Sequence, residues 1–167
     1  EEDSDQAAEV DFQEENDDIR QDFAQEVSND DIALFSDGVV KESEEENIVA
    51  SGTLNEGVYA VFWKLYEDGN LIFSGNGSIN GYSKYNAPWY QYRQKINRII
   101  IEDGIKEIGN GDFYGCNNVN EVIIGKSVRN IEFDAFRECI NLKSVTFSDS
   151  LKQICDSAFR NCSSLVS

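Results

Sequence analysis

Residues 119–139 read VNEVIIGKSVRNIEFDAFREC, and the same pattern recurs in residues 96–116 and 142–162. The 23-residue period is plainest in three cysteines and three phenylalanines, at Cys116, Cys139, Cys162 and at Phe113, Phe136, Phe159. A fixed period of about 20–50 residues is the sequence signature of a repeat array. Residues 95–167 are therefore expected to form three successive coils of one kind.

Each unit contains a short segment that predicts a β-strand. Val122 and Ile124 alternate with Glu121 and Ile123, which is the pattern of a strand with one buried face. A unit this short cannot bury its apolar face alone, so the units must stack and equivalent residues must form ladders. We therefore expect a mostly β or α/β-type solenoid whose core contains aliphatic, phenylalanine and cysteine ladders.

Two apolar runs upstream of the array, residues 58–66 and 71–75, predict a β-hairpin. The residues between them, Glu67-Asp68-Gly69-Asn70, include the Asp-Gly pair that supplies a positive φ in tight turns. The tract 78–93 follows and contains Pro88-Trp89 and four tyrosines. We expect residues 51–94 to cap the first coil, because an open coil exposes strand edges. Tyr82 and Tyr85 are expected to be the more exposed aromatic residues, and stacking on a sugar ring is the alternative role for this tract.

Several repeat motifs resemble the BspA-type leucine-rich repeats of bacterial surface proteins. The resemblance rests on Gly104-Ile105-Lys106-Glu107-Ile108-Gly109, Asp112-Phe113-Tyr114-Gly115-Cys116, Ala135-Phe136 and Ala158-Phe159, and it covers about residues 52–167. It implies a short leucine-rich-repeat array that binds a protein or host-matrix partner through its repeat face. The family's proline after the strand is absent. No asparagine ladder is expected after the strand, where Gly104, Ser127 and Ser150 stand.

The acidity of the chain is concentrated in residues 1–50. This segment has 19 acidic residues against Arg20 and Lys41, a net charge of −17 out of the total of −18. Such a composition cannot bury enough apolar surface to offset chain entropy, so the segment is expected to be disordered. The charge also disfavours a nucleic-acid partner.

Both ends of the sequence suggest a processed or partial chain. The first residue is Glu1 and the chain has no Met, which suggests a mature, secreted form at the bacterial surface. No apolar run approaches the ~20 residues of a membrane span, so none is expected. The array stops three residues into a fourth coil. We therefore expect either a fragment of a longer array or a dimer formed through the open C-terminal coil.

The residue types that usually carry catalysis are scarce. The chain has no His, and its glycines do not form a phosphate-binding loop. Cysteines at one position of successive coils form a line and not the tetrahedron that zinc requires. They are expected to be free, buried thiols, with Cys155 off the ladder as the exception. The sequence predicts no catalytic, cofactor-binding or metal-binding residues and no enzymatic activity.

Two surface rows remain as candidate partner-binding sites. Outward-facing residues of the repeat strands form the candidate strand face, which consists of Arg98, Ile100, Glu121, Ile123, Ser144 and Thr146. Exposed isoleucines on a sheet are typical of a partner site, although isoleucine is also simply a good strand former. Cations recurring once per coil form the candidate basic row, which consists of Lys106, Arg129 and Lys152. The row suggests an anionic partner, and an ordinary solvated surface is the alternative.

Three function classes are consistent with these features. The first is a non-enzymatic binding or adhesion module that contacts a protein or matrix partner, with a glycan as a further ligand class. The second is a structural spacer. The third is an ancillary module of a larger secreted protein, such as an enzyme.

Overall fold

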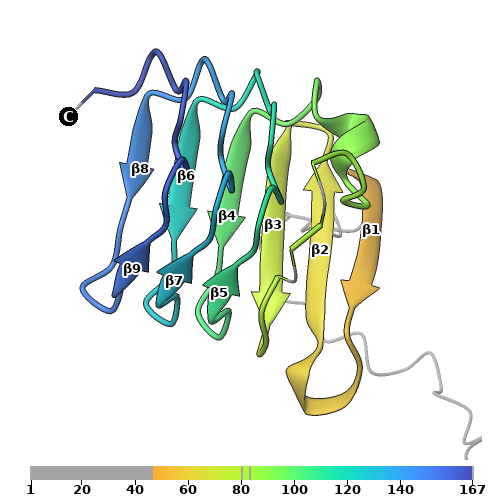
Figure 1. The fold of residues 1–167 in the computed structure, drawn as a ribbon. Helices are drawn as coiled ribbons and strands as arrows, with labels where there is room; N and C mark the ends of the chain where they lie inside the picture. Colours follow the sequence, from red (N-terminus) through yellow and green to blue (C-terminus); the bar gives the residue numbers. More distant parts are fainter. Residues whose placement is uncertain (1–46, 80, 83, 167) are drawn as a thin grey trace, which may run out of the picture. The chain divides into compact units, whose positions relative to one another are not determined.

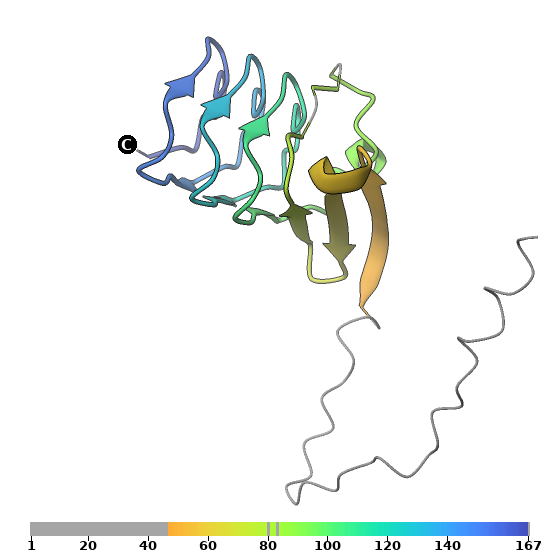
Figure 2. The same cartoon turned by 90° about the horizontal axis from the view of Figure 1, so that it is seen from below.

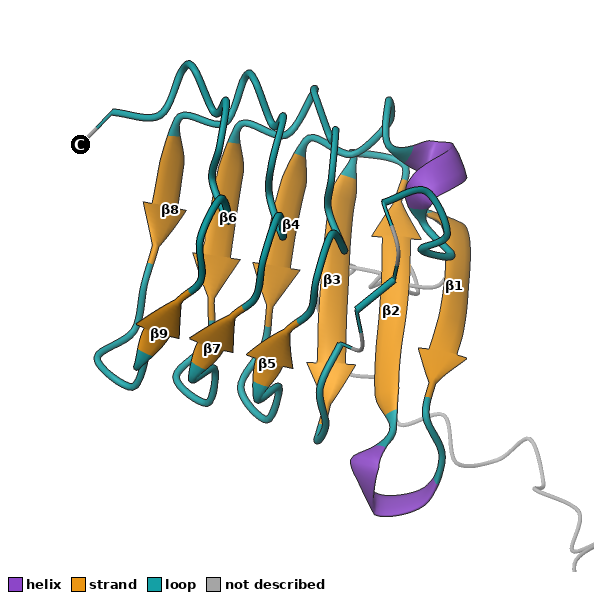
Figure 3. Cartoon of the chain, in the orientation of Figure 1, coloured by secondary structure: helices purple, strands orange, loops and turns teal. Residues whose placement is uncertain are grey.

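The computed structural model describes residues 47–79, 81–82 and 84–166, which form nine strands and two short 3-10 helices (Figures 1 and 3). The predicted acidic segment lies, up to Glu46, outside the described residues. Neither short helix approaches the length and apolarity needed to span a bilayer in this described part of the chain. The elements are β1 (Ile48–Leu54), η1 (Gly57–Tyr59), β2 (Val61–Tyr66), β3 (Asn70–Gly75), η2 (Tyr90–Tyr92), β4 (Arg98–Ile101), β5 (Glu107–Ile108), β6 (Glu121–Ile124), β7 (Asn130–Ile131), β8 (Ser144–Thr146) and β9 (Gln153–Ile154).

The larger sheet joins the predicted cap to the repeats. Its strand order is β1-β2-β3-β4-β6-β8, with antiparallel pairing up to β3 and parallel pairing from β3 onward. The β2–β3 hairpin is confirmed, and its turn contains Gly69 at a φ of 84°. The cap extends further upstream than the hairpin, because β1 begins at Ile48 and pairs with β2. Cap and coils therefore share one continuous sheet.

A second, smaller sheet lies on the other side of the coils, as the two views show (Figures 1 and 2). It has the order β5-β7-β9, and each of its strands has two residues. Successive coils pair in register at the repeat period in both sheets, for example Ile99 with Val122 and Ile108 with Ile131. The predicted mostly-β repeat fold with a 23-residue period and a hairpin cap is confirmed.

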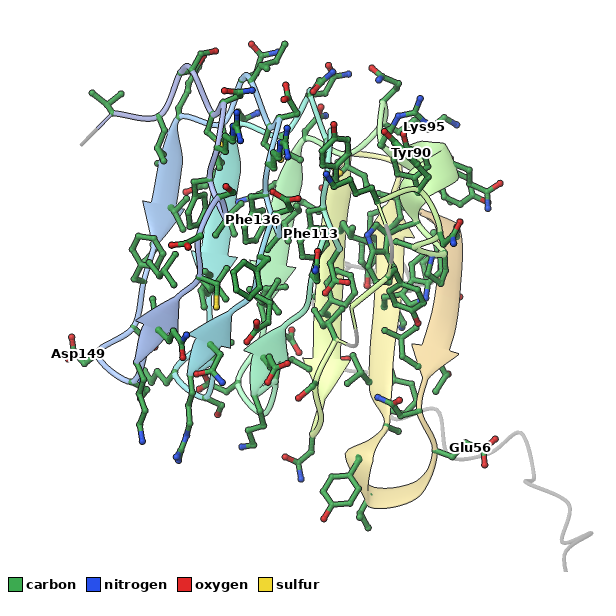
Figure 4. All side chains as sticks on the ribbon, in the orientation of Figure 1. Glu56, Tyr90, Lys95, Phe113, Phe136 and Asp149 are labelled. Carbon is green, nitrogen blue, oxygen red and sulfur yellow. The ribbon has the colours of Figure 1, made fainter. Side chains whose placement is uncertain are left out.

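The core contains the predicted phenylalanine ladder, whose members Phe113 and Phe136 are labelled in Figure 4. Their rings are nearly parallel, with centroids 5.1 Å apart, and the ring of Phe159 stacks on that of Phe136 with a centroid distance of 5.2 Å. Trp89 of the cap stacks on Phe113 at 5.7 Å and is fully buried. The structural role predicted for Pro88-Trp89 is therefore confirmed, because the cap supplies the aromatic ring that an earlier coil would otherwise supply.

One buried carboxyl group, that of Asp112, connects the cap to the first coil. Asp112 accepts hydrogen bonds from the backbone N–H of Tyr82 at 3.1 Å and of Gly109 at 2.7 Å, while its carbonyl oxygen accepts one from the Trp89 indole at 2.9 Å. Tyr82 is half-buried beside the Trp89 ring, so its predicted exposure is only partly correct. Tyr85 is 60% exposed, as predicted.

Asparagines connect successive turns of the chain at a position before the long strand of the coil. Asn118 donates to the Gln94 carbonyl at 2.6 Å, and Asn141, one repeat later, donates to the Asn117 carbonyl at 2.8 Å. Both residues stand before the long strand of their coil and not after it. The expectation that the array lacks an asparagine ladder therefore holds only for the position after the strand.

The cysteines of the ladder are free thiols that hydrogen-bond between coils. The Cys139 thiol donates to the Phe113 carbonyl at 3.2 Å, and the Cys162 thiol donates to the Phe136 carbonyl at 3.1 Å. Burial raises the pKa of Cys116 to about 12 and raises the pKa of Cys139 well above its ordinary value. The neutral thiols therefore act as small core side chains. Cys155, off the ladder, is also a free, buried thiol, and its sulfur lies 3.4 Å from the Glu132 carboxylate. The expected exception is therefore wrong, because the half-buried cysteine is Cys162 of the ladder.

Candidate interaction surfaces

The outer face of the six-stranded sheet carries the candidate strand-face residues in two straight rows. Strand pairing aligns Ile100 with Ile123 and Ile123 with Thr146. The neighbouring row aligns Arg98, Glu121 and Ser144. The alternate residues of β4 and β6, such as Ile99 and Val122, are buried beneath these rows, whereas Val145 of β8 is half-buried. The alternation seen in the sequence therefore places all six residues on one face.

The apolar row is longer than the repeat pattern predicts. Ile72 of β3 pairs in register with Ile100, which makes three consecutive half-buried isoleucines across β3, β4 and β6. Phe62 of β2 points to the same side of the sheet and is 46% exposed. The alternation within residues 71–75 predicts that Ile72 faces outward. It does not predict that the hairpin pairs in parallel with the first coil, which places Ile72 in this row. The cap therefore contributes two apolar side chains to this face.

Polar groups border the isoleucine row. The Nε of Arg98 lies 2.7 Å from a carboxylate oxygen of Glu121, which faces it across the strand pair. On the cap side, Lys64 is opposite Ile72 and is exposed. Cross-strand pairs of opposite charge contribute a few tenths of a kcal/mol to about 1 kcal/mol. The face thus combines an apolar centre with an ordered polar border, as protein-binding patches do.

The candidate basic row follows the turns between the two sheets. Lys106, Arg129 and Lys152 are all exposed. Their backbones are connected coil to coil, because Arg129 N–H donates to the Lys106 carbonyl at 2.9 Å and Lys152 N–H donates to the Arg129 carbonyl at 2.8 Å. None of the three forms an ion pair with the residues that the structure describes. This row therefore holds like charges about one strand spacing apart without local neutralisation.

A third group of side chains, the tyrosine cluster, lies where the cap loop covers the first coils. It consists of Tyr85, Tyr90 and Tyr114. The ring centroid of Tyr85 lies 5.4 Å from that of Tyr90 and 5.6 Å from that of Tyr114. Cations cover these rings, with Lys84 5.0 Å from the centre of Tyr114. The same ammonium group lies 3.0 Å from the Asp134 carboxylate of the second coil. These contacts connect the cap loop to two coils, so the cluster has a structural role.

The acid-base chemistry of the described residues is limited. They contain no group of three or more His, Cys, Asp and Glu side chains that could hold a metal ion. Burial raises the pKa of Asp112 to about 8, against the opposing effect of its two backbone hydrogen bonds. Its carboxyl group is 1% exposed beneath the cap and is not accessible to a substrate.

The repeat pattern and its geometry agree with a comparison against known families. A family model described as "BspA type leucine rich repeat region (6 copies)" matches residues 85–167. This repeat region belongs to the BspA-type leucine-rich repeat family. The resemblance inferred from the sequence is therefore confirmed, and leucine-rich repeats of this kind are generally protein-interaction modules. No curated protein matches the chain.

Solved structures support the BspA-type repeat fold. A leucine-rich repeat protein from Eubacterium ventriosum is 28% identical with a TM-score of 0.57, and the match covers 67% of this chain and 36% of that one. A leucine-rich repeat protein from T. pallidum matches at 26% identity and a TM-score of 0.41, covering 62% and 44% of the two chains. A leucine-rich cell-surface protein from Faecalibacterium prausnitzii is 20% identical with a TM-score of 0.38, and the match covers 68% of this chain and 41% of that one. Only the first match is close enough to support the fold, and this chain spans about a third of that protein's length.

The BspA-type coils of this chain differ from one another at two turn positions. The first coil has Gly111 and Gly115 with positive φ, whereas the second has Asp134 and Glu138 and the third has Ser157 and Asn161 at the same positions, with φ between 55° and 65°. A non-glycine residue in this conformation costs roughly 1–2 kcal/mol. The same turn geometry thus occurs in all three coils, although only the first coil has glycine at these positions.

Proposed function

We propose that this protein is a non-enzymatic interaction module displayed outside the bacterial cell, and that the outer face of its six-stranded sheet binds a protein partner. The observation that carries the proposal is the row of Ile72, Ile100 and Ile123, which lies in register on the outer face of the six-stranded sheet. Apolar side chains gathered in a row on an open sheet, bordered by polar groups, are typical of protein-binding sites. The location outside the cell rests on membership of a repeat family known from bacterial surface proteins.

The experiment is a binding screen of the full chain against purified extracellular-matrix proteins, with a glycan array run in parallel. A matrix protein that binds is then titrated with the double variant Ile100→Thr/Ile123→Thr. Threonine already stands at position 146 of this row and forms strands well, so the fold should persist. Affinity should fall about tenfold or more, as expected when the centre of an interface loses apolar contacts.

The matched control is the triple variant Lys106→Ser/Arg129→Ser/Lys152→Ser, which changes a different surface and should leave this affinity unchanged. Circular dichroism and thermal unfolding of both variants verify the fold. Unchanged binding by the double variant excludes the sheet face. Binding to no protein in the screen favours the spacer role and contradicts the proposal.

The basic row supports a second candidate function, which is binding of an anionic ligand. Lys106, Arg129 and Lys152 lack ion-pair partners among the described residues, so a polyanion would gain from their charge without displacing a carboxylate. A sulfated polysaccharide is a suitable probe for the screen. Its binding should weaken as salt rises and should be lost in the triple variant, whereas the double isoleucine variant should bind normally.

A further inference from the structure

The six-stranded sheet has two edge strands, and they differ in length and in chemistry. β8, at the last coil, has three residues, whereas β1, in the cap, has seven. Among the residues that the structure describes, β1 pairs with β2 alone, so its outer edge has no strand partner. The unfinished last coil predicts self-association at the C-terminal end, but the longer free edge lies at the opposite end of the sheet.

β1 lacks most of the features that protect edge strands from pairing. Natural edges are usually short, charged, interrupted by proline or bulged. β1 reads IVASGTL, with no charged residue and no proline, and its register shift is confined to Ile48–Ala50. The segment from Ala50 to Leu54 pairs regularly with β2. It therefore presents a regular and uncharged row of backbone donors and acceptors to solvent.

The sequence of β1 suits antiparallel pairing with a second copy of itself. A two-fold axis at Ser51 places Ser51 opposite Ser51, Ala50 opposite Gly52 and Val49 opposite Thr53. All of these side chains are small or β-branched and none is charged, so no like charges meet between the two β1 strands themselves. Ser51 and Thr53 are exposed in the single chain, so a change of either side chain disturbs no buried contact.

The loop after β1 provides a second, separate observation. Val58 and Tyr59 of η1 are 76% and 68% exposed, although both are apolar side chains next to a sheet edge. In an antiparallel pair the loop of one copy lies beside the beginning of β1 in the other copy. Val58 and Tyr59 can then pack near the half-buried Ile48 and Val49 of that copy, which adds apolar area to a backbone interface.

We propose that the protein forms a two-fold dimer through antiparallel pairing of β1 with β1. The two six-stranded sheets become one continuous sheet, because the symmetry axis at such a pair is perpendicular to the sheet. Both isoleucine rows then lie on the same side of the dimer. A surface with two copies of a partner would be bound with higher avidity than either single site provides.

Sedimentation velocity and static light scattering of the full chain over a concentration series test this proposal. The wild-type chain should show a reversible monomer–dimer equilibrium. Ser51→Lys and Ser51→Glu each place two like charges opposite one another, so each should weaken dimerisation about tenfold or more. An equimolar mixture of the two variants should restore a heterodimer, because lysine then meets glutamate.

The matched control is Ser144→Lys on β8, which adds the same charge to the other edge and should leave the dimer unchanged. Thermal unfolding of each variant identifies any loss of fold, and a heterodimer restored by mixing shows that both variants are folded. A chain that stays monomeric at high concentration overturns the proposal. Dissociation by Ser144→Lys, with no effect of Ser51→Lys, overturns it as well and assigns self-association to the last coil.

Discussion

The middle and last coils have nearly the same residue pattern but very different burial. Ile131 of the middle coil is fully buried, whereas Ile154, at the same position of the last coil, is 48% exposed. Ile124 is 4% exposed, and Phe147, its equivalent in the last coil, is 45% exposed. The backbone pairing is the same in kind, since β7 pairs with β9 and β6 pairs with β8. The difference arises because the described residues cover the middle coil on both sides and the last coil on one.

This contrast separates two properties that a repeat pattern is often taken to specify together. The pattern determines which side of a coil a residue faces, because that depends on local backbone geometry. Burial depends on a neighbouring coil, and a ladder residue gains most of its stabilisation only when both neighbours are present. Equivalent substitutions in the two coils should therefore have different energetic consequences.

The largest expected difference concerns the phenylalanine ladder. Phe136→Ala should lower the free energy of unfolding by about 3–5 kcal/mol, the usual range for a buried aromatic residue. Phe159→Ala should cost about half as much, because Phe159 is half-buried and stacks on one ladder neighbour, Phe136. Urea unfolding of the full chain, followed by circular dichroism, measures both values.

Phe133→Ala is the matched control within the middle coil. This side chain is half exposed, so its removal should change stability by no more than about 0.5 kcal/mol. Equal losses for Phe136→Ala and Phe159→Ala would show that the last coil is covered in solution as completely as the middle one.

The second expected difference concerns local opening. Backbone amides of β6 should be strongly protected from hydrogen exchange, whereas those from Leu151 onward should exchange through local fraying, because fewer contacts must be broken there. Fusing one more 23-residue repeat and a polar cap after Ser167 should raise protection in residues 144–165. Exchange measured by mass spectrometry checks this, and a last coil already as protected as β6 contradicts it.

The repeat region was the most predictable part of the molecule, because its 23-residue period determines where the strands lie, which residues form ladders and which side of the coil each residue faces. The cap was harder to predict. The pair Asp68-Gly69 predicts the hairpin turn. The pairing of β3 with β4, however, joins segments about one coil apart in the sequence, and no local sequence pattern predicts it. Ile72 was missed for this reason. β1 was missed because it begins within the segment that was assigned to disorder from its charge.

Asp112 provides the third test, at the closed end of the array. The second and third coils have Ala135 and Ala158 at this position, so Asp112→Ala gives the first coil the repeat residue. The change leaves the N–H groups of Tyr82 and Gly109 without their acceptor and should cost about 1–3 kcal/mol. Ala135→Gly, in the neighbouring coil, removes no hydrogen bond and serves as a comparison.

The cost of Asp112→Ala should depend on pH. Because the pKa of Asp112 is raised from its ordinary 3.8 to about 8, the folded state binds the proton more tightly than the unfolded state. The contribution of this carboxyl to stability is therefore complete below about pH 4 and is lost as the pH rises through about 8. The stability difference between wild type and Asp112→Ala should shrink from pH 5 to pH 8.5, and a difference that grows with pH would exclude the raised pKa.

The smallest expected effect concerns the left-handed turn residues and returns to the last coil. Ser157 has a φ of 62°, at the position where the first coil has Gly111. Ser157→Gly should stabilise the protein by up to about 1 kcal/mol, because glycine adopts this conformation without steric cost, although its greater freedom in the unfolded chain offsets part of the gain.

The reciprocal change is Gly115→Ala, where a Cβ meets nothing within 4 Å, so its expected loss of about 1 kcal/mol reports backbone conformation alone. Urea unfolding measures both. A loss with Gly115→Ala but no gain with Ser157→Gly would mean that the last coil is already open before the main unfolding transition, since strain relieved in an open segment cannot stabilise the folded core.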